Sequence, residues 1–128
     1  MSTLRVDTIQ NAAGTDSPIS VPGTAKAWVN FNGTGMVAIR ASYNVSSITD
    51  NATGDYTVNF TTAMVDANYS ATFGGYNTTV GDGGWIAAYN TGSGSYPTGV
   101  NTGSLRLATY ASAGTPQDQQ AVSVAIFR

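Results

Sequence analysis

The stretch that decides the fold spans residues 25–69, and its most informative part is SSITDNATGDYTVNF, residues 46–60. In the second half of this part, apolar and polar residues alternate: Tyr56, Val58 and Phe60 against Asp55, Thr57 and Asn59. This period of two predicts a strand with one buried face. The residues before it favour a polar loop, because short polar side chains bond local backbone and glycine tolerates positive φ: Asp50, Asn51, Thr53 and Gly54.

Two similar runs precede this strand. In the first, apolar and polar residues alternate as Ala27, Val29 and Phe31 against Lys26, Trp28 and Asn30. After the turn sequence NGTG at residues 32–35, the second alternates as Val37 and Ile39 against Met36, Ala38 and Arg40. Residues 43–45 then predict a bend or a short strand. Three strands joined by turns form the nucleus of a sheet, and we expect the rest of the chain to pack on it.

Further strands are expected along the rest of the chain, at residues 69–73 (closed by Gly74 and Gly75), 85–89, 103–111 and 119–127. The last is apolar on both sides, which predicts a central strand or one covered by a neighbour. Residues 61–68 could form a single helical turn, but the segment is short for a helix. Seven or eight strands with turns between them predict an all-β fold, an antiparallel β-sandwich of the jelly-roll type.

The first 23 residues differ from the rest. They carry scattered apolar side chains that are too few for a core of their own: Leu4, Val6, Ile9, Ile19 and Val21. They could be a terminus packed loosely on the domain, or an arm that adds a strand to a neighbouring subunit. We favour the arm, and therefore divide the chain into an N-terminal arm at residues 1–23 and a sandwich domain at residues 24–128.

Composition excludes several classes of function. Charged residues make up 9% of the chain, against roughly 25% in ordinary domains. The net charge is −2 and the five cations are scattered, so we expect no nucleic-acid binding. No apolar run is long enough to insert in a membrane. The chain has no cysteine and no signal-peptide pattern in its first ten residues, and both features suit folding in a reducing cytoplasm.

The sequence offers little for catalysis. Histidine, cysteine and glutamate are all missing, and these supply the usual bases, nucleophiles and zinc ligands. A turn could bring Asp50 and Asp55 together as the paired acids of a glycosidase, or with Asn51 as a site for a hard cation. Aspartates that cap loops are far commoner. We therefore expect no enzyme activity, no metal and no cofactor.

Aromatic residues in and beside the glycine-rich region, residues 74–103, are candidates for glycan contacts: Tyr76, Trp85, Tyr89 and Tyr96. Aromatic faces with Asn and Thr neighbours suit stacking and hydrogen bonding to sugars. The alternative is that Trp85 belongs to the core and that the tyrosines line a subunit interface, where aromatic residues are enriched.

Several segments closely resemble a module of fibre-like structural proteins of tailed bacteriophages. These segments are AKAWVNFNGTG (residues 25–35), IRASYNVSSI (39–48), GDYTVNF (54–60) and MVDANY (64–69), although the family usually has proline where Val65 stands. The opening MSTLRVDTIQN (1–11) is similar to the leader of many virion proteins of marine and cyanobacterial phages.

The resemblance implies a non-enzymatic virion structural protein made in the host cytoplasm and displayed on the particle surface. It implies a homotrimer that contacts other virion proteins, as a small tail fibre or a capsid decoration (cement) protein. A chain of 128 residues lacks the long stalk of a large fibre, which keeps capsid decoration open. The rival hypothesis is a carbohydrate-binding module that recognises a host surface glycan and so serves host attachment.

Overall fold

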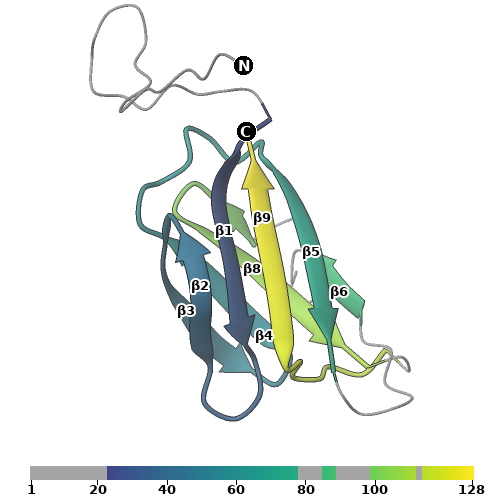
Figure 1. Cartoon of the computed structure of the whole chain (residues 1–128). Coiled ribbons are helices and arrows are strands. Elements are labelled where there is room, and N and C mark those ends of the chain that lie inside the picture. The colour runs from purple at the N-terminus through teal and green to yellow at the C-terminus, as the bar shows by residue number, and fades with distance from the viewer. Residues whose placement is uncertain (1–22, 78–84, 89–98, 112–113) are drawn as a thin grey trace, which may run out of the picture.

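The computed structural model describes residues 23–77, 85–88, 99–111 and 114–128. These residues form nine strands and no helix (Figure 1): β1 (Ala25–Asn32), β2 (Ala38–Tyr43), β3 (Val45–Ala52), β4 (Asp55–Phe60), β5 (Ser70–Tyr76), β6 (Trp85–Ala88), β7 (Val100–Asn101), β8 (Ser104–Tyr110) and β9 (Ala121–Phe127). In this part of the chain there is accordingly no helical stretch that could cross a membrane.

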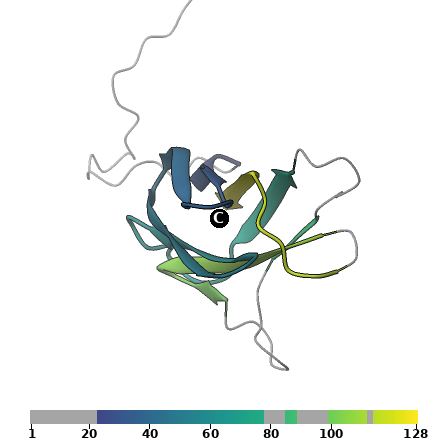
Figure 2. The same ribbon diagram turned by 90° about the horizontal axis from the view of Figure 1, so that it is seen from below.

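Two antiparallel sheets make up the fold. The first sheet has the order β2-β1-β9-β5, and the second has the order β3-β4-β8-β6, with the short β7 also paired to β8. Viewed along the strands, the two sheets lie face to face (Figure 2). The predicted all-β antiparallel sandwich is confirmed. β9 lies between β1 and β5, so its apolar character on both sides does mark a central strand.

The core lies between the sheets and follows the alternation of the sequence. The first sheet contributes Ala27, Val29, Phe31, Val122, Val124 and Ile126, and the second contributes Tyr56, Val58, Phe60, Leu105 and Leu107. Two pairs of aromatic rings pack against each other in this core. Phe31 and Tyr56 meet edge to face with ring centroids 5.3 Å apart, and Phe60 meets Tyr69 in the same way at 5.9 Å. The predicted burial of Tyr56, Val58 and Phe60 is confirmed.

The prediction of a polar loop before β4 is wrong for most of that segment. Asp50 and Asn51 lie inside β3, which pairs with β4 from Val45 to Ala52, and only Thr53 and Gly54 make the turn. β3 can be polar because it is an edge strand whose side chains face water and bond those of β4. Gly54 has a φ of +66°, and a Cβ there would collide with the carbonyl oxygen of Thr109, so glycine is required.

Three other predictions from the sequence also differ from the structure. β2 covers residues 38–43 instead of 36–40, and each of its residues is exposed. β5 does not close at Gly74 and Gly75 but continues to Tyr76, because β9 pairs with it over the whole length. Residues 61–68 contain no helical turn. The expected bend at residues 43–45 is present, and Asn44 at its centre has a φ of 54°.

Candidate interaction surface

The residues predicted to contact glycans do not form one described cluster. Tyr76 ends β5 in the first sheet and is 59% exposed. Trp85 begins β6 in the second sheet, where its backbone pairs with Tyr110. Tyr89 and Tyr96 lie outside the described residues, as do the arm residues Leu4, Val6, Ile9, Ile19 and Val21. Both sets therefore stay predictions.

The two aspartates considered as paired acids have separate environments. The Asp55 carboxylate accepts hydrogen bonds from Arg106 Nε at 2.8 Å and from a terminal guanidinium nitrogen of Arg106 at 2.5 Å, and a third from Asn51 Nδ2 at 3.3 Å. The hydrogen bond to Asp55 raises the pKa of Arg106. Asp50 lies in β3 opposite Tyr56. The ion pair gives Asp55 a structural role, and no three acidic residues in the described ranges are grouped as metal ligands would be.

A third aspartate ties the loops at one end of the sandwich together. Asp118 Oδ1 accepts a hydrogen bond from the Gly54 amide at 2.7 Å and another from the Tyr56 hydroxyl at 2.6 Å. The same hydroxyl lies 2.9 Å from the Gly33 carbonyl oxygen. Burial, and then the bond to Asp118, raise the pKa of Tyr56 far above its ordinary value. Tyr56 is therefore a protonated structural group, and this cluster joins the second sheet to two loops.

The outer face of the second sheet is covered by short polar side chains that bond one another. Asn59 Nδ2 donates to Ser47 Oγ at 3.0 Å and to Thr49 Oγ1 at 2.9 Å. Asn51 Nδ2 donates to Thr57 Oγ1 at 2.9 Å. The Asp55–Arg106 ion pair lies on the same face. The hydrogen-bonding groups of this face thus find many of their partners within the sheet itself.

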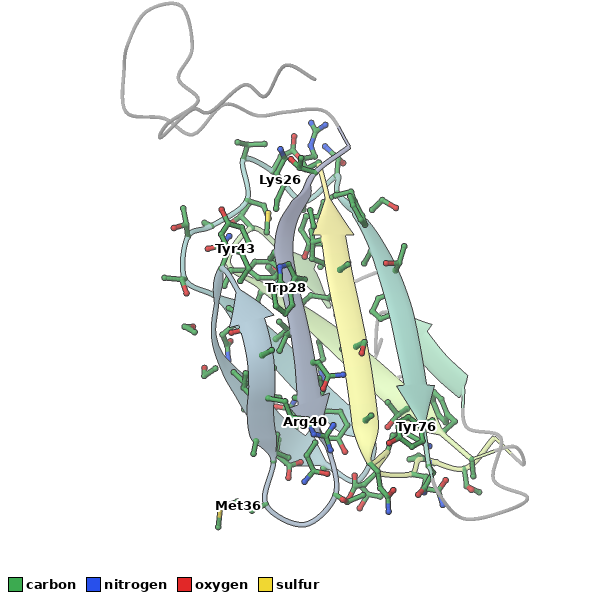
Figure 3. The ribbon with its side chains drawn as sticks, viewed as in Figure 1. Lys26, Trp28, Met36, Arg40, Tyr43 and Tyr76 are labelled. Atoms are coloured by element: carbon green, nitrogen blue, oxygen red, sulfur yellow. The ribbon has the colours of Figure 1, made fainter. Side chains whose placement is uncertain are left out.

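The outer face of the first sheet has a different chemistry. Two rows of side chains cross its four strands in register: Tyr43, Trp28, Ala125 and Thr72 in one row, and Ala41, Asn30, Ser123 and Gly74 in the next. Trp28 is 40% exposed and Tyr43 is 55% exposed, and Figure 3 shows them on neighbouring strands. We call Trp28 and Tyr43 the aromatic pair. Beside it, the side chains on β9 and β5 are small.

A cationic side chain lies on this face below the aromatic pair. Arg40 reaches from β2 across β1 and donates to the Gln120 carbonyl oxygen at 2.6 Å, to the Phe31 carbonyl oxygen at 3.3 Å and to Asn30 Oδ1 at 3.4 Å. All three acceptors are uncharged. By contrast, Arg106 and Arg128 are paired with Asp55 and Asp66. Arg40 therefore places a positive charge on the face with no described carboxylate against it.

Sequence reasoning did not find the aromatic pair. Trp28 stands on the polar side of the alternation in β1, and a large apolar residue in that position was the available signal. For Tyr43 the sequence predicts only a bend or a short strand. Comparison of the chain with models of known protein families, with curated protein sequences and with solved structures found no match.

Proposed function

We propose that the chain is a non-enzymatic structural protein of a tailed-phage particle, displayed on the particle surface as a homotrimeric small fibre or a capsid decoration protein. The observation that carries the proposal is where the phage-like residues lie in the fold. Residues 25–35, 39–48 and 54–60 lie in β1 to β4 and the turns between them. The resemblance therefore follows one continuous half of the sandwich, two strands in each sheet, and not scattered short matches.

The surface chemistry supports an assembling subunit. With charged residues at 9% of the chain, electrostatic repulsion between copies is weak. Subunits of this kind would associate through apolar and hydrogen-bonded surface, which salt does not screen. In this proposal residues 1–23 anchor the sandwich to a neighbouring subunit or to another virion protein. The homotrimer itself rests on the resemblance.

Quantitative mass spectrometry of purified particles tests the proposal. We expect the chain in every particle preparation, with tens to hundreds of copies per particle for a capsid decoration and few for a tail fibre. Absence from purified particles would contradict the proposal.

Two measurements on the purified protein test its parts. Light scattering should give a trimer at low and at high salt, and a monomer at micromolar concentration in both would contradict the trimer. Deleting residues 1–21 should leave a folded sandwich by circular dichroism and abolish attachment to the particle. Normal attachment of the shortened chain would show that the anchor lies elsewhere.

Glycan binding is the second candidate function, and one observation favours it. The aromatic pair stands exposed beside Asn30, Ser123 and Thr72 on a flat sheet face. This arrangement places the candidate glycan site on β1 and β2, away from Trp85, Tyr89 and Tyr96.

A further inference from the structure

We propose that the outer face of the first sheet binds a uronic-acid polysaccharide, with sugar rings stacked on Trp28 and Tyr43 and a sugar carboxylate paired with Arg40. This binding activity goes beyond the proposed particle role and does not depend on it.

The aromatic pair forms a platform on adjacent strands. Trp28 and Tyr43 are direct partners in the β1–β2 register, and residues so placed have Cβ atoms about 4.5–5.5 Å apart. Neither belongs to the hydrophobic core, so neither is required to be aromatic by the packing of the fold. Large aromatic side chains left exposed on one face mark an interaction site more often than isolated small apolar residues do.

The residues beside the platform leave room for a ligand that lies flat. Trp28 is followed across the sheet by Ala125 and Thr72, and the next row contains Ser123 and Gly74. None of these side chains is large. Asn30 Nδ2 donates to Ser123 Oγ and Asn30 Oδ1 accepts from Arg40. The hydroxyl groups of Ser123 and Thr72 are suited to sugar hydroxyls, because a hydroxyl can both donate and accept hydrogen bonds.

The charges select an acidic sugar. Among the described residues, the acceptors of Arg40 are uncharged oxygens, and a guanidinium has further N–H groups arranged as a planar fork that matches a carboxylate. Lys26 lies at the other end of the aromatic pair, where its ammonium donates to Thr24 Oγ1. Figure 3 shows the order Lys26, then Trp28 and Tyr43, then Arg40 down this side of the sheet. A polymer with repeated carboxylates fits cations on both sides of a stacking platform.

The described aspartates are placed elsewhere in the fold. Asp50 and Asp55 belong to β3 and β4 of the second sheet. Asp66 is paired with Arg128, and Asp118 is bonded to Gly54 and Tyr56. Within the described residues, the face thus presents Arg40 with no aspartate against it, although the chain as a whole carries a net charge of −2.

Isothermal titration calorimetry with a galacturonic-acid hexamer tests the proposal, with cellohexaose as the neutral comparison. We expect the acidic hexamer to bind about 10-fold or more tightly than the neutral one, with affinity falling as salt is raised. Trp28→Ala and Tyr43→Ala should each weaken binding about 10-fold or more, and Arg40→Gln should remove the preference for the acidic hexamer. Asn59→Ala, on the outer face of the second sheet, is the control and should leave sugar binding unchanged.

Thermal melting of each variant guards against a folding artefact. Arg40 also bonds the Gln120 and Phe31 carbonyl groups, so Lys26→Gln is a second charge variant, and it should weaken the acidic hexamer selectively. Equal binding of both hexamers, no binding of the acidic hexamer, or loss of binding in Asn59→Ala but not in Trp28→Ala would each overturn the proposal. So would sedimentation showing that Trp28→Ala or Tyr43→Ala dissociates an oligomer while no sugar binds, because the face would then be a protein interface.

Discussion

The outer faces of the two sheets enclose the same core but differ in chemistry. On the second sheet, Asn59, Asn51 and Asp55 form hydrogen bonds with neighbouring side chains, so these polar groups find partners within the sheet. On the first sheet, Asn30 Nδ2 likewise donates to Ser123 Oγ, but Trp28 and Tyr43 stand exposed beside small residues, and Arg40 has no described acid partner. Side chains that bond one another support the fold, whereas exposed rings and an unneutralised charge are available for a ligand. Stability and recognition are therefore separable by face.

The largest expected effect comes from the core that both faces share. Phe31 is fully buried and contacts Tyr56 across the sheets, so Phe31→Ala should lower the free energy of unfolding by roughly 3–5 kcal/mol. Urea denaturation measures it. Met36→Ala, at a residue 88% exposed, should change stability by less than about 0.5 kcal/mol. Phe60→Ala should behave like Phe31→Ala, and a loss below about 1 kcal/mol in both would place the core elsewhere.

A smaller effect is expected at the cluster that joins the second sheet to its loops. Asp118→Ala leaves the Gly54 amide without its acceptor and removes one of the two acceptors of the Tyr56 hydroxyl, which should cost about 1–3 kcal/mol of unfolding free energy. Asp118→Asn keeps an acceptor oxygen in the same place and should cost less. Equal losses in the two variants would show that charge, and not the hydrogen bonds, sets the contribution of Asp118.

The direct comparison of the faces uses one substitution on each. Asn59→Ala removes two side-chain bonds on the second sheet and should cost about 0.5–1.5 kcal/mol of stability without changing sugar affinity. Trp28→Ala should do the reverse, with stability within about 0.5 kcal/mol of the parent and sugar affinity reduced. Denaturation and calorimetry on both variants check this. A variant that changed both stability and sugar affinity would show that the two faces are not independent.

The smallest expected effect is a pH dependence at the Asp66–Arg128 ion pair. The hydrogen bond from Arg128 lowers the pKa of Asp66 from 3.8 to about 2. Because the pKa is lower in the folded chain than in the unfolded one, the contribution is complete above the unfolded pKa and is lost as pH falls from about 4 through 2. Denaturation between about pH 2 and 6 should show a slightly shallower acid loss in Asp66→Asn than in the parent. Superimposable curves would show that the ion pair does not contribute to the loss of stability in acid.

Much of the fold could be predicted from sequence because alternation and burial agree in β1, β4 and β9. Val29, Val58 and Val124 face the core as their periodicity requires. The edge strand β3 could not be predicted in this way, since only Val45 is buried in it and Ile48 is partly buried, so alternation carries little signal there. The same limit applies to β2, where every residue is exposed.

The aromatic pair depends on a register that local sequence does not reveal. Phe31 pairs with Ile39, and a regular ladder from that point would place Trp28 opposite Ser42. A shift between Asn30 and Phe31 places it opposite Tyr43 instead. One extra residue at such a bulge redirects side chains. Which exposed residues lie opposite each other on neighbouring strands is known only once the register of the strands is known.

The separation of the two faces is tested most directly by a two-dimensional amide NMR titration of the 13.2 kDa chain with the galacturonic-acid hexamer. We expect chemical-shift changes concentrated on β1, β2 and β9, with the largest near Trp28, Tyr43 and Arg40, and little change on β3, β4 and β8. Changes concentrated on the second sheet, or spread evenly over both, would contradict the assignment of recognition to the first sheet.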